Sequence, residues 1–237
     1  PVLSRIVARA AVEQLVTFLE TKNLISRNQH AYRKGHSTVT SLAEVTKYIY
    51  KYMDNGLIVG LASLDLSKAF DSSSHSHLLQ KCTDIGIGKS AVQWTESYLS
   101  NRTQKTSGVP QGSILGPILF IIFTNDLITA FKDTTHVVSY ADDTQLLEVG
   151  RTIEEVKEKL EGTVDTAQDW YKKNSLMSNP AKTEIIIFRT SKGKKHDITI
   201  KVTEDDQVVE LKPAECIKIL GVHVDECLEF TKQVKQV

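Results

Sequence analysis

The chain has 237 residues, of which 41% are apolar and 24% charged, and its acidic and basic side chains balance to a net charge of zero. This composition excludes a disordered, collagen-like or disulfide-stapled chain, and the length allows one large domain or two small ones with a sizeable core. Zero net charge provides no general argument for binding a polyanion.

The first half of the chain predicts two helices and a buried strand. Apolar residues recur with a helical period over 3–20, and again from Ser37, a typical N-cap residue, to the stop at Asn55–Gly56. The apolar run 57–64 then predicts a strand buried on both faces. Asp65 follows that strand directly, which is an unusual place for a carboxylate.

The remaining elements predict a mixed fold. Helices are expected over 76–83, 90–99, 114–131 and 153–173, and strands over 137–140, 144–149, 185–188, 198–202, 208–211 and 216–224. A tight turn containing Asp142 and Asp143 joins the first two of these strands, and a basic turn lies at 191–196. The fold class is therefore α+β, without internal repeats.

The cysteines and apolar runs of the chain predict its cellular environment. No apolar run reaches the roughly 18 residues of a membrane span, because Gly116 and Pro117 interrupt the longest one. The three cysteines lack CxxC spacing and a nearby histidine at ligand spacing, which is typical of reduced thiols. We therefore expect an intracellular protein, in the nucleus or the cytoplasm, with no membrane partner and no targeting signal.

Three carboxylates, Asp65, Asp142 and Asp143, interrupt segments that otherwise have the pattern of a core. An uncompensated buried carboxylate is costly, so these groups need salt bridges, protonation or a divalent cation such as Mg²⁺. A simple solvated hairpin turn at Asp142–Asp143 is an equally good interpretation of the local sequence.

Eight motifs, taken together, resemble one known family. They are 29–38 (QHAYRKGHST), 64–71 (LDLSKAFD), 98–102 (YLSNR), 108–117 (GVPQGSILGP), 124–127 (TNDL), 140–143 (YADD), 179–183 (NPAKT) and 220–222 (LGV). Their order and spacing are similar to those of the reverse transcriptases of non-LTR (LINE-type) retrotransposons, especially the Jockey-like clades. The resemblance covers nearly the whole chain.

The resemblance implies an RNA-directed DNA polymerase domain with a right-hand architecture. Residues 1–56 would be an N-terminally truncated part of the fingers. Residues 57–237 would be the palm, an antiparallel sheet backed by helices, with the remaining fingers elements, and the chain would end just after the primer grip, without a thumb. The implied partners are an RNA template, a DNA primer, deoxynucleoside triphosphates, and the endonuclease and thumb of a longer polyprotein.

The resemblance also assigns metal ligands. Asp65 and Asp142 would ligate two Mg²⁺ ions, for which Mn²⁺ could substitute, with Asp143 beside them and the carbonyl of Leu66 as an extra ligand. One ion would lower the pKa of the primer 3′-hydroxyl, and the other would hold the triphosphate and neutralise the leaving pyrophosphate.

Four further residues would contact the incoming nucleotide around its sugar and phosphates. Phe70 would pack under the deoxyribose, Gln111 and Gly112 would allow close approach of the nucleotide, and Lys182 would protonate pyrophosphate or stabilise its charge. Without the resemblance, the same residues are a core phenylalanine, a turn before a helix cap, and a surface lysine.

The remaining assignments are a fingers contact and the primer grip. Arg33 and Lys34 would contact the triphosphate or the template backbone. Leu220, Gly221 and Val222 resemble the primer-grip turn, although a strand with one glycine has the same pattern.

The alternative function is a catalytically inactive, truncated or co-opted retrotransposon remnant that at most binds nucleic acid. Residues 102–107 support this alternative, because they form a shorter connection than the family usually has. Six residues can join the preceding helix to the loop at Gly108, but they are too few to form a paired hairpin as well.

Overall fold

The computed structural model describes residues 2–66, 74–100, 114–176, 182–189, 198–204 and 207–234. Its helices are α1 (Val2–Thr21), α2 (Thr38–Met53), α4 (His75–Asp84), α5 (Lys89–Ser100), α6 (Gly116–Thr124), the 3₁₀ helix η1 (Asn125–Ala130), α7 (Ile153–Lys173) and α8 (Thr231–Val234). Its strands are β1 (Ile58–Leu64), β2 (His136–Tyr140), β3 (Asp143–Gly150), β4 (Glu184–Phe188), β5 (Ile200–Glu204), β6 (Gln207–Leu211), β7 (Cys216–Ile219) and β8 (Val222–Asp225).

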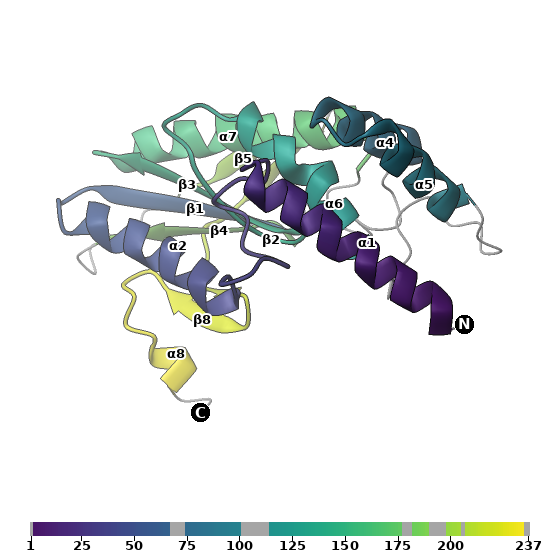
Figure 1. Cartoon of the computed structure of the whole chain (residues 1–237). Helices are drawn as coiled ribbons and strands as arrows, with labels where there is room; N and C mark the ends of the chain where they lie inside the picture. The colour runs from purple at the N-terminus through teal and green to yellow at the C-terminus, as the bar shows by residue number, and fades with distance from the viewer. Residues whose placement is uncertain are drawn as a thin grey trace.

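An antiparallel sheet with the strand order β2-β3-β1-β4 forms the centre of the fold (Figure 1). Strand β1 pairs with β3 on one side and with β4 on the other, so that Leu64 lies opposite Thr144 and Ser63 opposite Glu184. Five of the seven β1 residues are buried, which confirms the predicted two-sided burial. Strands β5–β6 and β7–β8 form two separate antiparallel hairpins.

Other elements cover both faces of the central sheet. Successive side chains of a strand point to opposite faces, so each face contributes its own set of buried residues. One face packs against α6 and α7, and it includes Ala62, Leu64, Leu146 and Ile185. The other face packs against α2 and the β7–β8 hairpin, and it includes Leu61, Leu147, Ile186 and Phe188. Figure 1 shows α7 above the sheet, and α2 and the yellow β7–β8 hairpin below it.

Helix α7 packs very closely on β1, and its predicted bounds, 153–173, are confirmed. Thr152 is the N-cap of the helix, and its side chain accepts a hydrogen bond from the Glu155 amide at 3.1 Å. A Cβ atom added to Gly60 would lie 2.5 Å from Val156 Cγ1 and 2.6 Å from Leu160 Cδ1. Only glycine permits this approach of helix and strand without rearrangement.

The sequence predicted one long helix over 114–131, but α6 ends at Thr124 and η1 follows. The Asn125 side chain explains the change, because it is hydrogen-bonded to the loop after α1. Its Oδ1 accepts from the Ser26 amide at 3.0 Å, and its Nδ2 donates to the Leu24 carbonyl at 2.7 Å. These contacts are distant in sequence, so helical periodicity does not reveal them.

The predicted single strand 216–224 is also wrong, because it is a hairpin of β7 and β8. Leu220 and Gly221 have φ angles of 48° and 91°, so both lie in the left-handed region that a two-residue hairpin turn of type I′ requires. Among the described residues, no helix is both long and apolar enough to cross a membrane.

Candidate active site

Asp65 lies directly after the central strand, between one basic and one acidic neighbour. Continuing the register of β1 by one residue places Asp65 opposite Asp143 on one side and opposite Lys182 on the other. Lys182 Nζ donates a hydrogen bond to Asp65 Oδ2 at 2.8 Å, and 55% and 36% of the two side chains are exposed. The pair therefore lies at the surface of the sheet's end.

The second acidic segment is the turn between β2 and β3. Tyr140 pairs with Asp143, so the turn consists of Ala141 and Asp142 alone. Asp143 is the first residue of β3, which corrects the prediction that both aspartates lie in the turn. Ala141 has a φ of 56°, a left-handed conformation that is uncommon for a residue with a side chain.

The three carboxylates interact electrostatically. Burial raises the pKa of Asp142, as does the charge of Asp65, while Lys182 acts in the opposite direction. Burial and the charges of Asp142 and Asp65 raise the pKa of Asp143 to about 6. Among the described residues, the cluster thus holds three carboxylates beside the ammonium group of Lys182.

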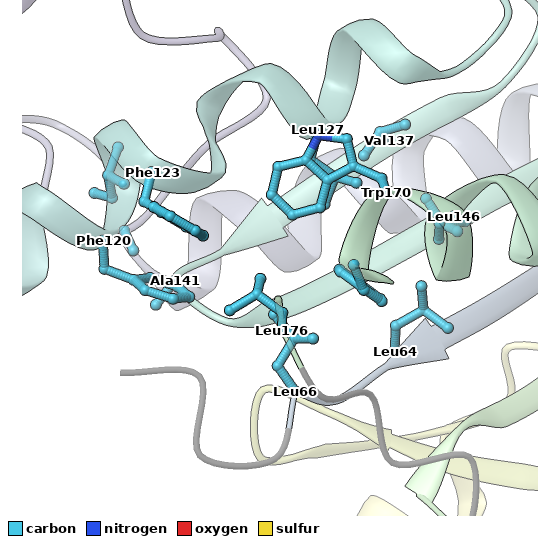
Figure 2. Packing of buried hydrophobic residues seen from close by; sticks show 14 of the residues in the cluster. Leu64, Leu66, Phe120, Phe123, Leu127, Val137, Ala141, Leu146, Trp170 and Leu176 are labelled. Atoms are coloured by element: carbon cyan, nitrogen blue, oxygen red, sulfur yellow. The ribbon is translucent and has the colours of Figure 1, made fainter. Parts of the chain in front are cut away.

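Buried apolar residues adjoin the three carboxylates in the chain, and burial raises the pKa of two of them, Asp142 and Asp143. Leu64 and Leu66, on either side of Asp65, and Ala141, before Asp142, belong to the same buried cluster. Figure 2 shows Leu66, Leu176 and Ala141 packed at this end of the sheet, together with Phe120 from α6.

The donor chemistry of the site fits a hard divalent cation. Carboxylate oxygens and a main-chain carbonyl are the ligands that Mg²⁺ prefers. Burial first, and then the neighbouring negative charges, raise the pKa of Asp142 and of Asp143, so a bound cation would favour their ionised forms. Within the described ranges, no three Asp, Glu, His or Cys side chains are already arranged to hold an ion. Asp65 instead contacts Lys182.

Arg33 and Lys34 occupy different environments. The Arg33 side chain is 9% exposed. Its guanidinium forms a bidentate salt bridge with Glu20, with Nε–Oε1 at 2.7 Å and Nη2–Oε2 at 2.9 Å. Its Nη1 donates to the carbonyls of Ser26 at 2.7 Å and Gln29 at 3.1 Å. Lys34 is exposed. Arg33 is therefore bound to the protein, and its predicted contact with triphosphate or template stays a prediction.

Leu220, Gly221 and Val222 lie on the face of the sheet that α2 covers. Leu220 and Gly221 form the turn, and Val222 pairs with Ile219 as the first residue of β8. Leu220 and Val222 pack against the buried cluster beneath the sheet. The predicted turn is confirmed, and its role as a primer grip stays a prediction.

The predicted nucleotide contacts Phe70, Gln111 and Gly112 lie outside the described residues, as do the connection 102–107 and the basic turn 191–196.

Sequence reasoning gave no role to Gln29, which the structure places beside the acidic turn. Its Oε1 accepts a hydrogen bond from the amide of Ala141 at 3.2 Å, and its side chain is buried. The place of Gln29 at the start of the motif 29–38 was its local signal, and that motif did not reveal the contact because it joins segments far apart in the chain.

The chain matches a family model described as "Reverse transcriptase (RNA-dependent DNA polymerase)" over residues 1–224. Among curated proteins, it is 28% identical over 252 residues to the probable RNA-directed DNA polymerase from transposon BS of Drosophila melanogaster, covering 98% of this chain and 27% of that protein. It is 25% identical over 256 residues to the RNA-directed DNA polymerase from mobile element jockey of the same species, covering 100% and 27%. The chain thus spans about a quarter of these relatives.

Solved structures show the same fold at low sequence identity. Apo telomerase from Candida tropicalis, truncated from its C-terminal domain, aligns with a TM-score of 0.62 and 13% identity over 94% of this chain and 44% of that one. Telomerase from the same organism in complex with a fragment of telomeric RNA aligns with a TM-score of 0.57 and 12% identity, over 85% and 35%. These likenesses concern the fold alone.

Proposed function

Because the chain belongs to the reverse transcriptase (RNA-dependent DNA polymerase) family, we propose that it is the RNA-directed DNA polymerase domain of a non-LTR retrotransposon. The proposed reaction transfers a nucleotide from a deoxynucleoside triphosphate to the 3′-hydroxyl of a DNA primer, with RNA as the template. The polymerase names of the BS and jockey relatives support this assignment.

The observation that carries the proposal is the meeting of two chain segments at one end of the sheet. Asp65 follows β1, whereas Asp142 lies in the β2–β3 turn and Asp143 begins β3, and the register brings Asp65 opposite Asp143. The raised pKa values of Asp142 and Asp143 support close mutual approach. Such a cluster of carboxylates suits phosphoryl transfer.

The carboxylates would hold two Mg²⁺ ions, or Mn²⁺ in their place, through Asp65, Asp142, Asp143 and the Leu66 carbonyl. When bound, the ions would activate the primer hydroxyl and neutralise the leaving pyrophosphate. Lys182 would supply a positive charge, and a proton, at the pyrophosphate. Its present partner, Asp65, raises the pKa of Lys182, so the ammonium form is strongly favoured.

The remaining site residues are proposed on the resemblance. Phe70 would pack under the sugar of the incoming nucleotide, and Gln111 and Gly112 would allow its close approach. Lys34, which is exposed, would contact its phosphates or the template. The β7–β8 turn at Leu220–Val222 would hold the primer.

We assign residues 1–56 to the fingers and residues 57–237 to the palm with additional fingers elements. The central antiparallel sheet β2-β3-β1-β4, with helices on both faces, supports the palm assignment. The proposed partners are RNA template, DNA primer and the other domains of a longer retrotransposon protein, acting in the cytoplasm or nucleus.

A primer-extension assay tests the proposal. The chain is incubated with poly(rA), an oligo(dT) primer, thymidine triphosphate and Mg²⁺, and the Asp142→Asn variant is assayed in parallel. We expect extension by the unmodified chain and a loss of several orders of magnitude in the variant. A folded chain that binds the hybrid but does not extend the primer would contradict the proposal, as would equal activity of the two proteins.

A further inference from the structure

We propose that Gln29 is a positioning residue that holds the acidic turn Ala141–Asp142 in its working conformation. It would act through the Ala141 amide rather than by touching substrate. This inference deepens the proposed function, on which it rests for the importance of the turn, while the hydrogen bond itself does not depend on any activity.

The segment 28–30 lies alongside β2 as a short parallel addition to the edge of the sheet. Gln29 and Ser139 form an isolated parallel bridge. The Ser139 amide donates to the Asn28 carbonyl, and the His30 amide donates to the Ser139 carbonyl, both at 2.8 Å. This backbone pairing fixes Gln29 two residues from the start of the turn.

The Gln29 side chain uses that position to bind two backbone amides. Its Oε1 accepts from the Ala31 amide at 2.9 Å and from the Ala141 amide at 3.2 Å. Gln29 is 5% exposed and Ala141 is 9% exposed, so little water is available to replace either bond. One carboxamide oxygen therefore joins the loop after α1 to the acidic turn.

Ala141 needs such support because of its backbone conformation. Its φ of 56° lies in the left-handed region, where a residue with a Cβ atom is strained unless its surroundings hold it there. An amide buried without an acceptor would add a further penalty. Removing the Gln29 acceptor should therefore loosen the turn that carries Asp142.

Gln29 is itself anchored to the first helix. Its carbonyl accepts from Arg33 Nη1 at 3.1 Å, and the same guanidinium binds both carboxylate oxygens of Glu20 on α1. Arg33 lowers the pKa of Glu20, so the pair stays ionised well below neutral pH. A continuous series of polar contacts thus runs from α1 through Arg33 and Gln29 to Ala141.

The test compares two substitutions at Gln29 with a matched substitution elsewhere. Gln29→Met keeps the volume of the side chain but removes the acceptor, whereas Gln29→Glu keeps an acceptor. Gln145→Met is the control, because Gln145 on β3 is also buried and its Oε1 has no hydrogen-bond partner among the described residues.

The first readout is amide hydrogen exchange of the full 237-residue chain without metal, followed by NMR. We expect the Ala141 amide to exchange at least tenfold faster in Gln29→Met than in the unmodified chain, with Leu146 in β3 as an internal reference. Protection should persist in Gln29→Glu and Gln145→Met. If the Ala141 amide of the unmodified chain exchanges as fast as an exposed amide, the proposal is wrong, whether or not Gln29→Met folds.

The second readout is Mn²⁺ binding measured by electron paramagnetic resonance. We expect Gln29→Met to raise the dissociation constant about tenfold, and Gln29→Glu to restore it to the unmodified value or lower. Equal weakening by Gln29→Met and Gln145→Met would show a merely structural role and overturn the proposal. Absence of Mn²⁺ binding by the unmodified chain would count against the proposed function instead, and the amide exchange would then decide the role of Gln29.

Discussion

Lys182 Nζ lies 2.8 Å from Asp65 Oδ2, and the two residues continue the pairing of β4 with β1 beyond the last paired positions. Asp143 occupies the corresponding place on the other side of Asp65. The central carboxylate of the site therefore has a cation on one neighbouring segment and a second carboxylate on the other.

Asp65→Asn and Asp142→Asn should each lower the rate of primer extension by several orders of magnitude. Each change removes a charge that would stabilise the transition state through the bound ions, a contribution of several kcal/mol. Asp143→Asn should have a milder effect. Single-turnover extension measures the rates, and Asp54→Asn, at an exposed residue after α2, is the control that should stay unchanged. Near-normal extension by Asp142→Asn would disprove the assignment.

Asp143 should make the metal-free fold more stable in mild acid than at neutral pH. Its pKa is about 6 in the folded chain against a reference of 3.8, so the folded state takes up the proton first as the pH falls. Stability from this group therefore rises between pH 7 and pH 4, and it is lowest above the folded pKa. Asp143→Asn should remove the dependence and add about 1 kcal/mol at pH 7, a value reduced for partial exposure.

The measurement is chemical denaturation with EDTA present, at several pH values. The difference between the unmodified chain and Asp143→Asn isolates this carboxyl from the other titrating groups. A difference that is constant from pH 4 to pH 7 would show that Asp143 titrates normally.

Lys182→Gln should slow nucleotide transfer without changing the unfolding midpoint. Its ammonium is exposed, so its bond to Asp65 adds little to the stability of the fold, whereas a proton donor at the leaving group contributes roughly 10²–10⁴-fold to a rate. Lys201→Gln is the matched control, because Lys201 is an exposed lysine paired across strands with Glu210. Equal extension rates for the two variants would leave Lys182 with no chemical role.

Gly60→Ala should destabilise the fold by about 1–3 kcal/mol through overpacking against α7. The added methyl group would lie 2.5 Å from Val156 Cγ1. Gly162→Ala on α7 is the opposite case, because its Cβ would meet no atom within 4 Å, and it should stabilise the helix by about 0.5–1 kcal/mol. Urea denaturation of both variants measures whether the free energy of unfolding falls in Gly60→Ala and rises in Gly162→Ala. Tolerance of Gly60→Ala would mean that α7 can move away from β1.

Local patterns predicted most of the individual elements. The helical period of the apolar residues over 153–173 predicted α7, and the apolar run before Asp65 predicted β1, because these signals lie within the elements themselves. The motifs also identified the acidic residues that meet at the sheet's end.

Contacts between distant segments account for the failures. The hydrogen bonds of Asn125 to the loop after α1 end helix α6, and no period in 114–131 contains that information. The bond from Ala141 to Gln29 likewise depends on the parallel bridge at Ser139. At Leu220, the left-handed backbone of a leucine goes against the usual preference for glycine or asparagine. The apolar pattern therefore predicted one strand over 216–224, and only the resemblance of Leu220–Val222 to the primer-grip motif indicated a turn.

The position of β1 at the centre of the sheet has a consequence for how the chain reaches its fold. Leu64 pairs with Thr144 and Val59 with Phe188, so the central strand is made long before either of its partners. Closing loops of that length is slow. During synthesis, one edge of β1 stays unpaired until β3 has left the ribosome, and the other edge until β4 has followed. We therefore expect this chain to refold more slowly than most domains of its size. We also expect the nascent chain to depend on chaperones that keep β1 from pairing with strands of other chains.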